Sequence, residues 1–353
     1  MEYANYIAHC IEIARRGEYF VAPNPMVGAV LVGPDPAREG HQSILAEGWH
    51  ERYGEAHAEV NCFRHAEEAF SSRHSSVSYK DCTLFVSLEP CSHYGKTPPC
   101  AKLIVEKGVG RVVVGMLDPN PLVAGKGVQM LRDAGIEVIV GVLEDQCRAL
   151  NKRFLCLHEQ HRPYVILKWA QTADGFIDRR RTIDDGQGIA NKGQQHLNGA
   201  LAISTPETKK IVHRMRAENM AIMVGTRTVL LDNPRLLNTH WEGRHPVRIT
   251  LDRHNVIPDD ARIFSDESET IVYRDRTDWP FVLNDLAARN IHSVLVEGGT
   301  TLLAHILQTG IWDEIHIEIA PELNIGDGVP APRITLPDRY ETVDGHRLYT
   351  IYK

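Results

Sequence analysis

The chain has 353 residues, with 39 lysines and arginines against 46 aspartates and glutamates, which gives a formal net charge of −7. This length fits about two domains, and ordinary globular composition excludes wholesale disorder. The acidic balance argues against a nucleic-acid-binding protein, which needs a basic face. Seven cysteines are too few for a disulfide framework, and the acidic N-terminus does not resemble a secretory signal, so we expect a cytoplasmic protein.

The first half of the chain alternates between apolar strands and helical segments. Residues 3–14 place apolar side chains at helical spacing, which predicts an amphipathic helix. Short β-rich runs predict strands at 26–33, 83–88, 111–117 and 136–142. Helical segments lie between them at 57–70, 100–108 and 125–135. All these runs are shorter than the ~20 residues that span a bilayer, so we expect an α/β domain and no membrane segment.

A charged helical stretch near 143–162 stops at Pro163 and marks a domain boundary. We expect a first domain at 1–148, a helical linker at 149–162 and a second α/β domain at 163–353. The predicted strands of the second domain are 163–170, 221–226, 247–252, 270–275, 292–299 and 313–321, and its predicted helices are 206–218 and 300–310. The polar, aperiodic segment 179–195 predicts a loop.

A constellation typical of zinc enzymes lies in the first half. His57 and Glu59 form a His-x-Glu, and Cys91 and Cys100 follow, the first directly after a proline. Zinc deaminases carry His-x-Glu followed by Pro-Cys-x-x-Cys; here eight residues separate the cysteines. One imidazole and two thiolates leave the fourth tetrahedral position of the metal for a water whose pKa falls toward neutrality. Glu59 can move the proton of that water to the leaving amine.

A purely structural zinc is the alternative, and it requires a fourth protein ligand. His93 is the nearest candidate. The catalytic zinc is favoured by a rare conjunction: a His-x-Glu that opens a helix, a Pro-Cys after a strand, and a second cysteine that opens another helix.

The second half lacks the Gly-x-Gly-x-x-Gly of a Rossmann nucleotide site. Its nearest feature is an apolar strand that runs into Gly298, Gly299 and Thr300 and then into a helix. Two glycines let a phosphate approach the backbone, and a helix N-terminus offers free N–H groups. Alone, this pattern is also typical of an ordinary strand–helix turn.

On these residues, the first half resembles the bifunctional deaminase–reductases of riboflavin biosynthesis, the RibD/RibG family. Five stretches carry the resemblance across residues 1–148: 24–28, 48–50, 57–61, 89–100 and 118–121. The resemblance implies a cytidine-deaminase-like three-layer α/β/α fold, with a diaminopyrimidinone that carries a phosphoribosylamino group as the small-molecule substrate. The family holds the base and the sugar phosphate at positions that match Asn24, His50, His93 and Lys96.

Residues 163–325 resemble the reductase half of the same family, which has a dihydrofolate-reductase-like α/β fold. In that family NADPH gives a hydride to the ribosyl carbon and opens the sugar into a ribityl chain. The matching positions that line the substrate are Lys168, Asp232 and Glu297, which join Glu59 as catalytic candidates. The cofactor-binding candidates are Ala170, Thr172 (where serine is usual), Asp174, Gly175, Gly225, Thr228, Gly298, Gly299 and Thr300.

Two departures from the family concern the phosphate of the reductase substrate. Where the family has Trp-Ile-Thr and then an arginine, this chain has Ala-Ile-Ser at 202–204 and Lys209. His240 stands roughly where a second arginine is expected. Lysine lacks the bidentate fork of arginine, and histidine is mostly neutral at neutral pH. We expect Lys209 to bind the phosphate; the other candidates are Arg216, Arg235, Arg244 and His240.

The sequence therefore predicts a two-domain enzyme, a zinc-dependent deaminase followed by an NADPH-dependent reductase, which we expect to form a homo-oligomer (dimer or tetramer). Arg227 is one candidate for selecting NADPH over NADH. A second hypothesis keeps the deaminase and makes the reductase half an assembly module, because its phosphate site departs from the family. A third, a base-flipping deaminase on RNA, is disfavoured by the acidic charge and the cysteine spacing.

Overall fold

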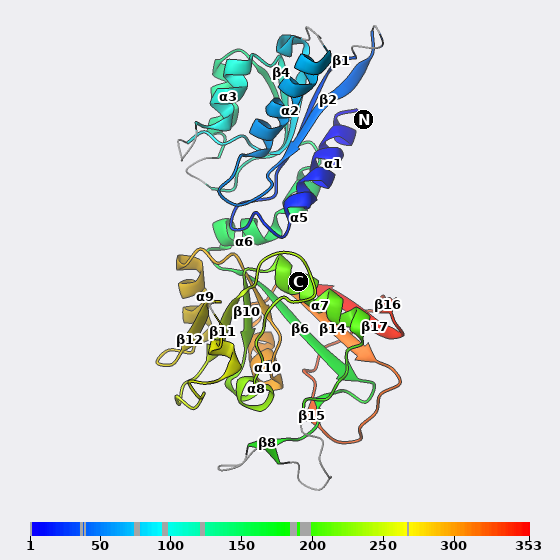
Figure 1. Ribbon diagram of the computed structural model, residues 1–353, viewed down its shortest axis with the longest axis vertical. Helices are drawn as coiled ribbons and strands as arrows, with labels where there is room; N and C mark the ends of the chain where they lie inside the picture. Colours follow the sequence, from blue (N-terminus) through cyan, green and yellow to red (C-terminus); the bar gives the residue numbers. More distant parts are fainter. Residues whose placement is uncertain are drawn as a thin grey trace. The chain divides into compact units, whose positions relative to one another are not determined.

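The computed structural model describes residues 2–35, 38, 40–73, 78–93, 98–120, 124–183, 189–190, 199–266 and 268–353. The chain divides into two compact units, Met1–His161 and Arg162–Lys353, which Figure 1 draws in blue to green and in green to red. Each unit is built on its own sheet, of five strands in the first and eight in the second. None of the described helices is long and apolar enough to cross a membrane.

The first unit is a sheet with helices on both faces. Its strands are β1 Gly28–Pro34, β2 Gln42–Trp49, β3 Thr83–Leu88, β4 Arg111–Met116 and β5 Glu137–Val140. Its helices are α1 Glu2–Ala14, α2 Ala58–Arg73, α3 Cys100–Lys107, α4 Lys126–Asp133, α5 Glu144–Leu150 and α6 Lys152–Gln160. The strand order is β2-β1-β3-β4-β5, with antiparallel pairing around β1 and parallel pairing from β3 to β5.

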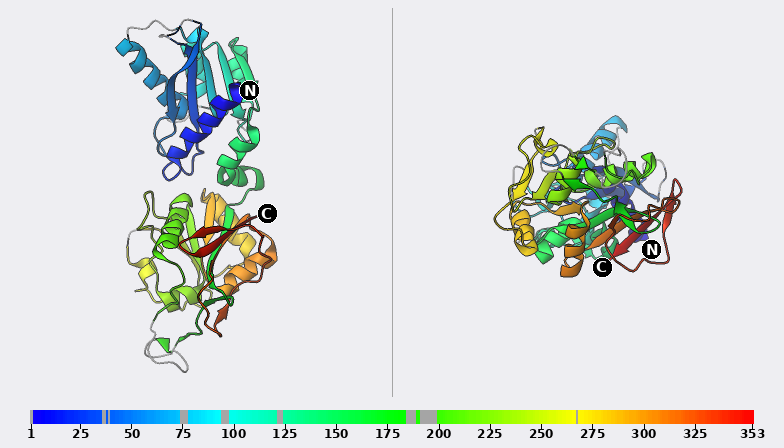
Figure 2. Two further views of the ribbon diagram at one scale, coloured as in Figure 1. Left: turned by 90° about the vertical axis from the view of Figure 1, so that its right-hand side faces the viewer. Right: turned by 90° about the horizontal axis from the view of Figure 1, so that it is seen from below.

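Two hydrophobic clusters cover the two faces of this sheet. Neighbouring residues of β1 point to opposite faces: Leu31 packs in the cluster of α2, α3 and α4, whereas Val30 packs in the cluster of α1 and α5. Figure 2 shows α1 running along the strands close to α5. Because both faces are covered, the inner strands are continuous apolar runs, and the unit is a three-layer α/β/α structure.

The second unit has one large sheet and two short ladders. Its strands are β6 Tyr164–Thr172, β7 Phe176–Asp178, β8 Thr182–Ile183, β9 Ile189–Ala190, β10 Ala221–Val224, β11 Val247–Leu251, β12 Thr270–Tyr273, β13 Ser293–Val296, β14 Glu314–Ala320, β15 Val329–Pro330, β16 Glu341–Val343 and β17 His346–Tyr352. Its helices are α7 Pro206–Glu218, α8 Thr226–Asp232, α9 Trp279–Ala288 and α10 Thr300–Thr309.

The order of the large sheet is β12-β11-β10-β13-β6-β14-β17-β16. Pairing is parallel from β12 to β14, and β17 and β16 complete the sheet as antiparallel strands. The parallel part brings the carboxyl ends of β11, β10 and β13 to the same edge, where open α/β sheets bind their ligands.

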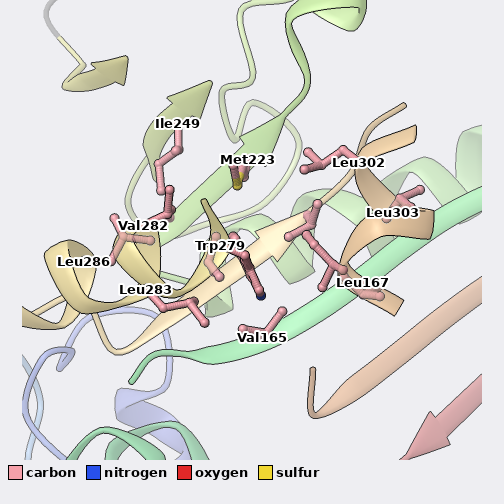
Figure 3. Packing of buried hydrophobic residues seen from close by; sticks show 14 of the residues in the cluster. Val165, Leu167, Met223, Ile249, Trp279, Val282, Leu283, Leu286, Leu302 and Leu303 are labelled. Carbon is pink, nitrogen blue, oxygen red and sulfur yellow. The ribbon is translucent and has the colours of Figure 1, made fainter. Parts of the chain in front are cut away.

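The core of the second unit lies between this sheet and two helices. Figure 3 shows α9 and α10 packing side chains against the strands: Trp279, Val282, Leu283, Leu286, Leu302 and Leu303 face Val165, Leu167, Met223 and Ile249. A second, smaller cluster includes Val229 of α8 and covers Val224 of β10. Burial on both faces explains the apolar runs of β10 and β13.

Several elements differ from the sequence prediction. The segment 179–195 is not wholly a loop, because β8 and β9 pair within it as a short antiparallel ladder. The elements that the sequence did not predict are β2, β7, β15, β16, β17, α8 and α9. The strands β2, β16 and β17 are partly exposed and carry polar residues, so their apolar signal is weak. Asp278 caps the N-terminus of α9: its side chain accepts from the N–H of Phe281, and this capping signal could have revealed the helix.

The charged stretch before Pro163 forms two helices, α5 and α6, that meet at Asn151. The side chain of Asn151 pairs with the backbone of Met26: Oδ1 accepts from its N–H at 2.8 Å, and Nδ2 donates to its carbonyl oxygen at 2.9 Å. Leu150 and Leu155 are buried in the core of the first unit. Both helices therefore pack as part of that unit, which ends at His161.

We predict that a fragment of residues 1–161 folds alone and is more stable than a fragment of residues 1–146. The shorter fragment removes Leu150 and Leu155 from the core, and each lost buried leucine costs about 2–5 kcal/mol. Urea unfolding followed by circular dichroism should give a lower midpoint for the shorter fragment. Equal midpoints would show that α5 and α6 do not stabilise the unit.

Candidate active sites

A cluster of metal-binding side chains lies in the first unit. His57, Cys91 and Cys100 offer one ligand atom each, and these atoms lie within 4.8 Å of one another. His57 Nδ1 is 3.7 Å from the sulfur of Cys91 and 3.4 Å from that of Cys100. A tetrahedral zinc, with bonds of about 2.0–2.1 Å to nitrogen and about 2.3 Å to sulfur, separates the two ligand atoms by about 3.5 Å. The three side chains therefore fit a zinc ion.

The secondary structure brings these ligands together. His57 directly precedes α2, Cys91 follows β3, and Cys100 is the first residue of α3. The helix α2 lies so close to β2 that a Cβ on Gly48 would be 2.3 Å from the backbone nitrogen of Cys62. The glycine is thus required for the approach that holds His57 in place. The side chain of Cys100, then that of His57, lowers the pKa of Cys91 to about 4 against the effect of burial, and the backbone N–H of Cys100, which donates to the sulfur of Cys91 at 3.3 Å, adds to this.

Glu59 lies beside the ligands and is only 3% exposed. Burial, only partly offset by the nearby His57, raises the pKa of Glu59 to about 6. A carboxyl group with this pKa can both accept and release a proton near neutral pH, as a general acid–base requires. Glu59 is not part of the three-residue ligand cluster, so its position agrees with a proton carrier rather than a ligand.

Next to the cluster, His50 and Asn24 form a hydrogen-bonded pair. His50 is buried, and its Nδ1 donates to the carbonyl of Ala56 at 3.0 Å. This leaves Nε2 as an acceptor for the side-chain amide of Asn24, 3.1 Å away. Burial lowers the pKa of His50, so the ring is neutral at pH 7. The ring centre of His50 lies 5.5 Å from that of His57, which places the pair beside the metal ligands.

Glu89 supports the site in a way that the sequence did not reveal. Its buried carboxylate accepts from four backbone N–H groups, those of Asp118, Gly125, Gly127 and Val128, at 2.9 to 3.1 Å. These bonds hold the loop between β4 and α4 against the segment that leads to Cys91. The other two predicted substrate residues of this domain are less informative: His93 is exposed and is not among the clustered ligands of the described chain, and Lys96 lies outside the described residues.

The second unit contains a cleft of about 1310 Å³ at the carboxyl edge of its sheet. The predicted residues that line it are Lys168, Ala170, Lys209, Arg216, Gly225, Thr228, Asp232, Glu297, Gly298, Gly299 and Thr300. The cleft therefore unites all three catalytic candidates of this domain with most of its cofactor candidates.

A lysine and an arginine in the cleft neighbour the half-buried Glu297. Arg216 donates to both carboxylate oxygens of Glu297, at 2.9 and 2.7 Å, and to the carbonyl of Leu237 at 3.0 Å. Burial lowers the pKa of Lys168, against the opposing charges of Glu297 and Glu318. Two nitrogens of Arg216 donate to Glu297. The charge of Arg216 is therefore paired with this carboxylate and is not available to bind a phosphate.

Asp232 is held by an arginine that the sequence analysis did not select. Arg181, whose side chain is only 3% exposed, donates to Asp232 at 2.5 Å and to Asp178 at 2.7 Å. Its third nitrogen donates to the carbonyl of Leu231 at 3.2 Å. Burial raises the pKa of Asp232 in spite of this pairing. Arg181 thus fixes the orientation of the carboxyl group that faces the cleft.

A second residue that the sequence did not indicate is Glu318 of β14. It is 3% exposed and accepts from the hydroxyls of Ser204 and Thr208, at 2.6 and 2.7 Å, and from Nδ1 of His346 at 2.7 Å. Burial alone would raise the pKa of Glu318, but these hydrogen bonds and Lys168 hold it below its ordinary value. Ser204 occupies one of the positions where the chain departs from its family, so this network gives that position a structural partner.

The candidate phosphate ligands do not all reach the cleft. Lys209 is exposed and lines it. His240 is not among the described lining residues; its Nδ1 instead contacts Nε2 of His213 at 3.1 Å. His213 lines the cleft, and burial lowers its pKa to about 4, so it carries no charge at neutral pH. Arg235 pairs with Asp266. Neither Arg235 nor the half-buried Arg244 is among the described residues that line the cleft.

Three of the predicted cofactor-binding residues are not among the described residues that line the cleft. Thr172, Asp174 and Gly175 form the turn between β6 and β7. Thr172 donates to Asp174 at 2.6 Å, and Asp174 accepts from the N–H groups of Ile325 and Gly326. Gly175 has a φ of +86°, which favours glycine. These contacts give the three residues a role in shaping the turn.

Comparison with known proteins assigns each half of the chain to a protein family. Residues 1–116 match the cytidine and deoxycytidylate deaminase zinc-binding region, and residues 163–334 match the RibD C-terminal domain. The riboflavin biosynthesis protein RibD of Aquifex aeolicus is 36% identical over 348 residues, which cover 92% of this chain and 88% of that protein. The chain belongs to the RibD family. The RibD protein of Escherichia coli is 34% identical over 353 residues, covering 90% of this chain and 87% of that protein.

Solved structures agree with this assignment. The RibD-type deaminase–reductase of Thermotoga maritima superposes with a TM-score of 0.80 at 33% identity, covering 99% of this chain and 98% of that one. Acinetobacter baumannii RibD gives a TM-score of 0.82 at 30% identity with the same coverage. The predicted fold class is confirmed, as are the two activities of riboflavin biosynthesis, deamination with zinc and reduction with NADPH.

We predict that Cys91→Ser and Glu59→Gln separate metal binding from catalysis. Loss of one of three protein ligands should remove both zinc and deamination, because the site no longer holds the ion. Glu59→Gln should keep about one zinc per chain and lower deamination by at least ~10²-fold, the scale of a positioned proton carrier. Elemental analysis and ammonia release measure the two effects. If Glu59→Gln also loses zinc, then Glu59 is a ligand.

Proposed function

We propose that the first domain hydrolytically deaminates 2,5-diamino-6-(5-phosphoribosylamino)pyrimidin-4-one and that the second reduces the ribosyl group of the product to ribityl. The observation that carries the first step is the cluster of His57, Cys91 and Cys100 with the buried carboxyl of Glu59 beside it. The Thermotoga maritima structure is described as a diaminohydroxyphosphoribosylaminopyrimidine deaminase and 5-amino-6-(5-phosphoribosylamino)uracil reductase, which supports the same pair of substrates here.

In the deamination, the oxygen of a water adds to the ring carbon that bears the amine, and the carbon–nitrogen bond then breaks to release ammonia. His57, Cys91 and Cys100 would hold a zinc ion, which would lower the pKa of the attacking water. Glu59 takes a proton from this water and delivers it to the departing nitrogen. The amide of Asn24, oriented by the neutral ring of His50, recognises the edge of the pyrimidine. Both residues lie beside His57, where the base must sit.

In the reduction, a hydride from NADPH joins the anomeric carbon, the bond from this carbon to the ring oxygen breaks, and the oxygen takes up a proton. Lys168 is placed to hold that proton, because its ammonium lies in the cleft and burial lowers its pKa. Asp232, oriented by Arg181, accepts hydrogen bonds from the sugar hydroxyls. Gly298, Gly299 and the N-terminus of α10 receive the pyrophosphate of the dinucleotide.

The alternative, a second domain that serves only for assembly, rests on the missing family arginines at the phosphate site. The cleft retains Lys168, Asp232 and Glu297 with their ion pairs, and this supports the reductase. An assay that supplies the deaminase substrate and follows both ammonia and NADPH tests the two readings. Ammonia release without NADPH oxidation would favour the assembly module, and release of neither would contradict both activities.

We also infer a cytoplasmic enzyme that forms a homo-oligomer. Seven cysteines, all free thiols, support a reducing compartment. Sedimentation equilibrium tests the oligomer, and a monomer at micromolar concentration would contradict it.

We predict that Lys209→Ala raises the KM of the reductase for its phosphorylated substrate about tenfold or more, because a lost lysine–phosphate contact costs about 1.5–3 kcal/mol. The kcat should change little, since the phosphate is remote from the hydride transfer and binds alike in ground and transition states. Steady-state NADPH oxidation measures both constants.

The neighbouring Lys210 provides a matched control. It pairs with Glu207 and is not among the described lining residues, so Lys210→Ala should leave KM unchanged. Equal KM values for the phosphorylated and dephosphorylated substrates in the unmodified protein would contradict a phosphate site.

A further inference from the structure

One end of the cleft carries an arginine that the sequence analysis did not select. Arg253 follows β11, and both Arg253 and Thr277, which follows β12, line the cleft. The guanidinium of Arg253 donates through Nε and Nη2 to the hydroxyl of Thr277, and the Nε–Oγ1 distance is 3.1 Å. The hydroxyl of Thr277 thus restrains the guanidinium of Arg253 where both residues line the cleft.

Among the arginines that line the described cleft, Arg253 and Arg227 are the two that form no ion pair with a carboxylate of the described chain. Arg180 and Arg181 form ion pairs with aspartates, and Arg216 forms one with Glu297. Arg227, the earlier candidate for cofactor selection, donates to the carbonyl of Arg181. Within the described chain, the hydrogen bonds of the Arg253 guanidinium go to the hydroxyl of Thr277 and to no carboxylate, and its side chain is exposed. Its charge is therefore available to an anion without the loss of an existing ion pair.

The strand order sets the position of Arg253 relative to a dinucleotide. Gly298 and Gly299, which receive the pyrophosphate, follow β13. Lys168, where the hydride is transferred, lies on β6, on one side of β13, whereas β10 and β11 follow in order on the other side. A dinucleotide with its nicotinamide near Lys168 and its pyrophosphate at the glycines directs its adenosine half across β10 toward β11. Arg253 lies at that end.

We propose that Arg253, held by Thr277, binds the 2′-phosphate of NADPH and gives the reductase its preference for NADPH over NADH. This inference rests on the proposed function of the cleft as a nicotinamide site. Guanidinium suits the role, because its planar fork binds two phosphate oxygens at once and stays charged at every physiological pH. The 2′-phosphate is the group that distinguishes the two dinucleotides, so a cation placed there affects one of them and spares the other.

The test measures dinucleotide binding to the full-length, zinc-loaded protein by isothermal titration calorimetry, without substrate. Arg253→Gln should raise the Kd of NADPH about tenfold or more, the scale of a lost charge-assisted hydrogen bond. The Kd of NADH should stay the same within about twofold, since NADH has no 2′-phosphate. Thr277→Val should shift the Kd of NADPH in the same direction by a smaller factor, because the arginine remains but loses its support.

Two arginines serve as controls. Arg276 stacks on Phe281 and is not among the described lining residues, so Arg276→Gln should leave both Kd values unchanged. Arg227→Gln separates the rival assignment: a loss of NADPH preference in this variant, with the preference intact in Arg253→Gln, would overturn the proposal. An equal weakening of NADPH and NADH by Arg253→Gln would also overturn it. If the unmodified protein binds neither dinucleotide, the reductase proposal itself fails.

Discussion

Parallel strand pairing is the constraint on which the cleft of the second unit depends. Parallel strands bring their carboxyl ends to one edge of the sheet, where the chain leaves the hydrogen-bonded ladder and its N–H groups and side chains become available to a ligand. The residues that follow β10, β11 and β13 meet there. The same rule operates in the first unit, where β3 and β4 pair in parallel and the chain leaves β3 toward Cys91.

The carboxylates inside the cleft already have ion-pair or hydrogen-bond partners within the protein, without a bound ligand. Glu297 has Arg216, Asp232 has Arg181, and Glu318 has two hydroxyls and a histidine. A buried charge without such partners costs several kcal/mol (about 3–5 when one partner of a pair is removed). The compensation also holds each side chain in one orientation, so substrate meets groups that need little rearrangement. Lys209 and Arg253 also line the cleft, and their side chains are exposed. An anionic ligand can therefore form an ion pair with either of them.

The sequence predicted most of the fold and the metal site because the signals are local. His57, Cys91 and Cys100 stand at the starts of helices or the end of a strand, and the structure brings them together as the motif indicates. Contacts between distant segments leave no such signal. Neither the bond from His346 to Glu318 nor the anchoring of the loop after β4 by Glu89 could be found without knowing which strands are neighbours.

The roles that the resemblance implies for single residues of the second unit stay predictions, and the structure adds their contacts. The resemblance implies that the turn containing Thr172 and Asp174 binds the cofactor; in the structure these two side chains bond to each other and accept from the N–H groups of Phe176, Ile325 and Gly326. It also implies that His240 binds the phosphate; in the structure the ring of His240 contacts that of His213, which lines the cleft. Replacement of an arginine by a shorter side chain changes which residue reaches the cleft, and this depends on packing that a sequence match does not describe.

The pairing of Asn151 with Met26 also imposes an order on the assembly of the first domain. The two residues are 125 positions apart, and Met26 lies two residues after Asn24, which contacts His50. During synthesis from the N-terminus, all three zinc ligands leave the ribosome before Asn151 does. The metal can therefore be captured by a chain in which the segment of Asn24 and Met26 is not yet held by Asn151, and this segment is fixed beside His50 only when α5 and α6 dock.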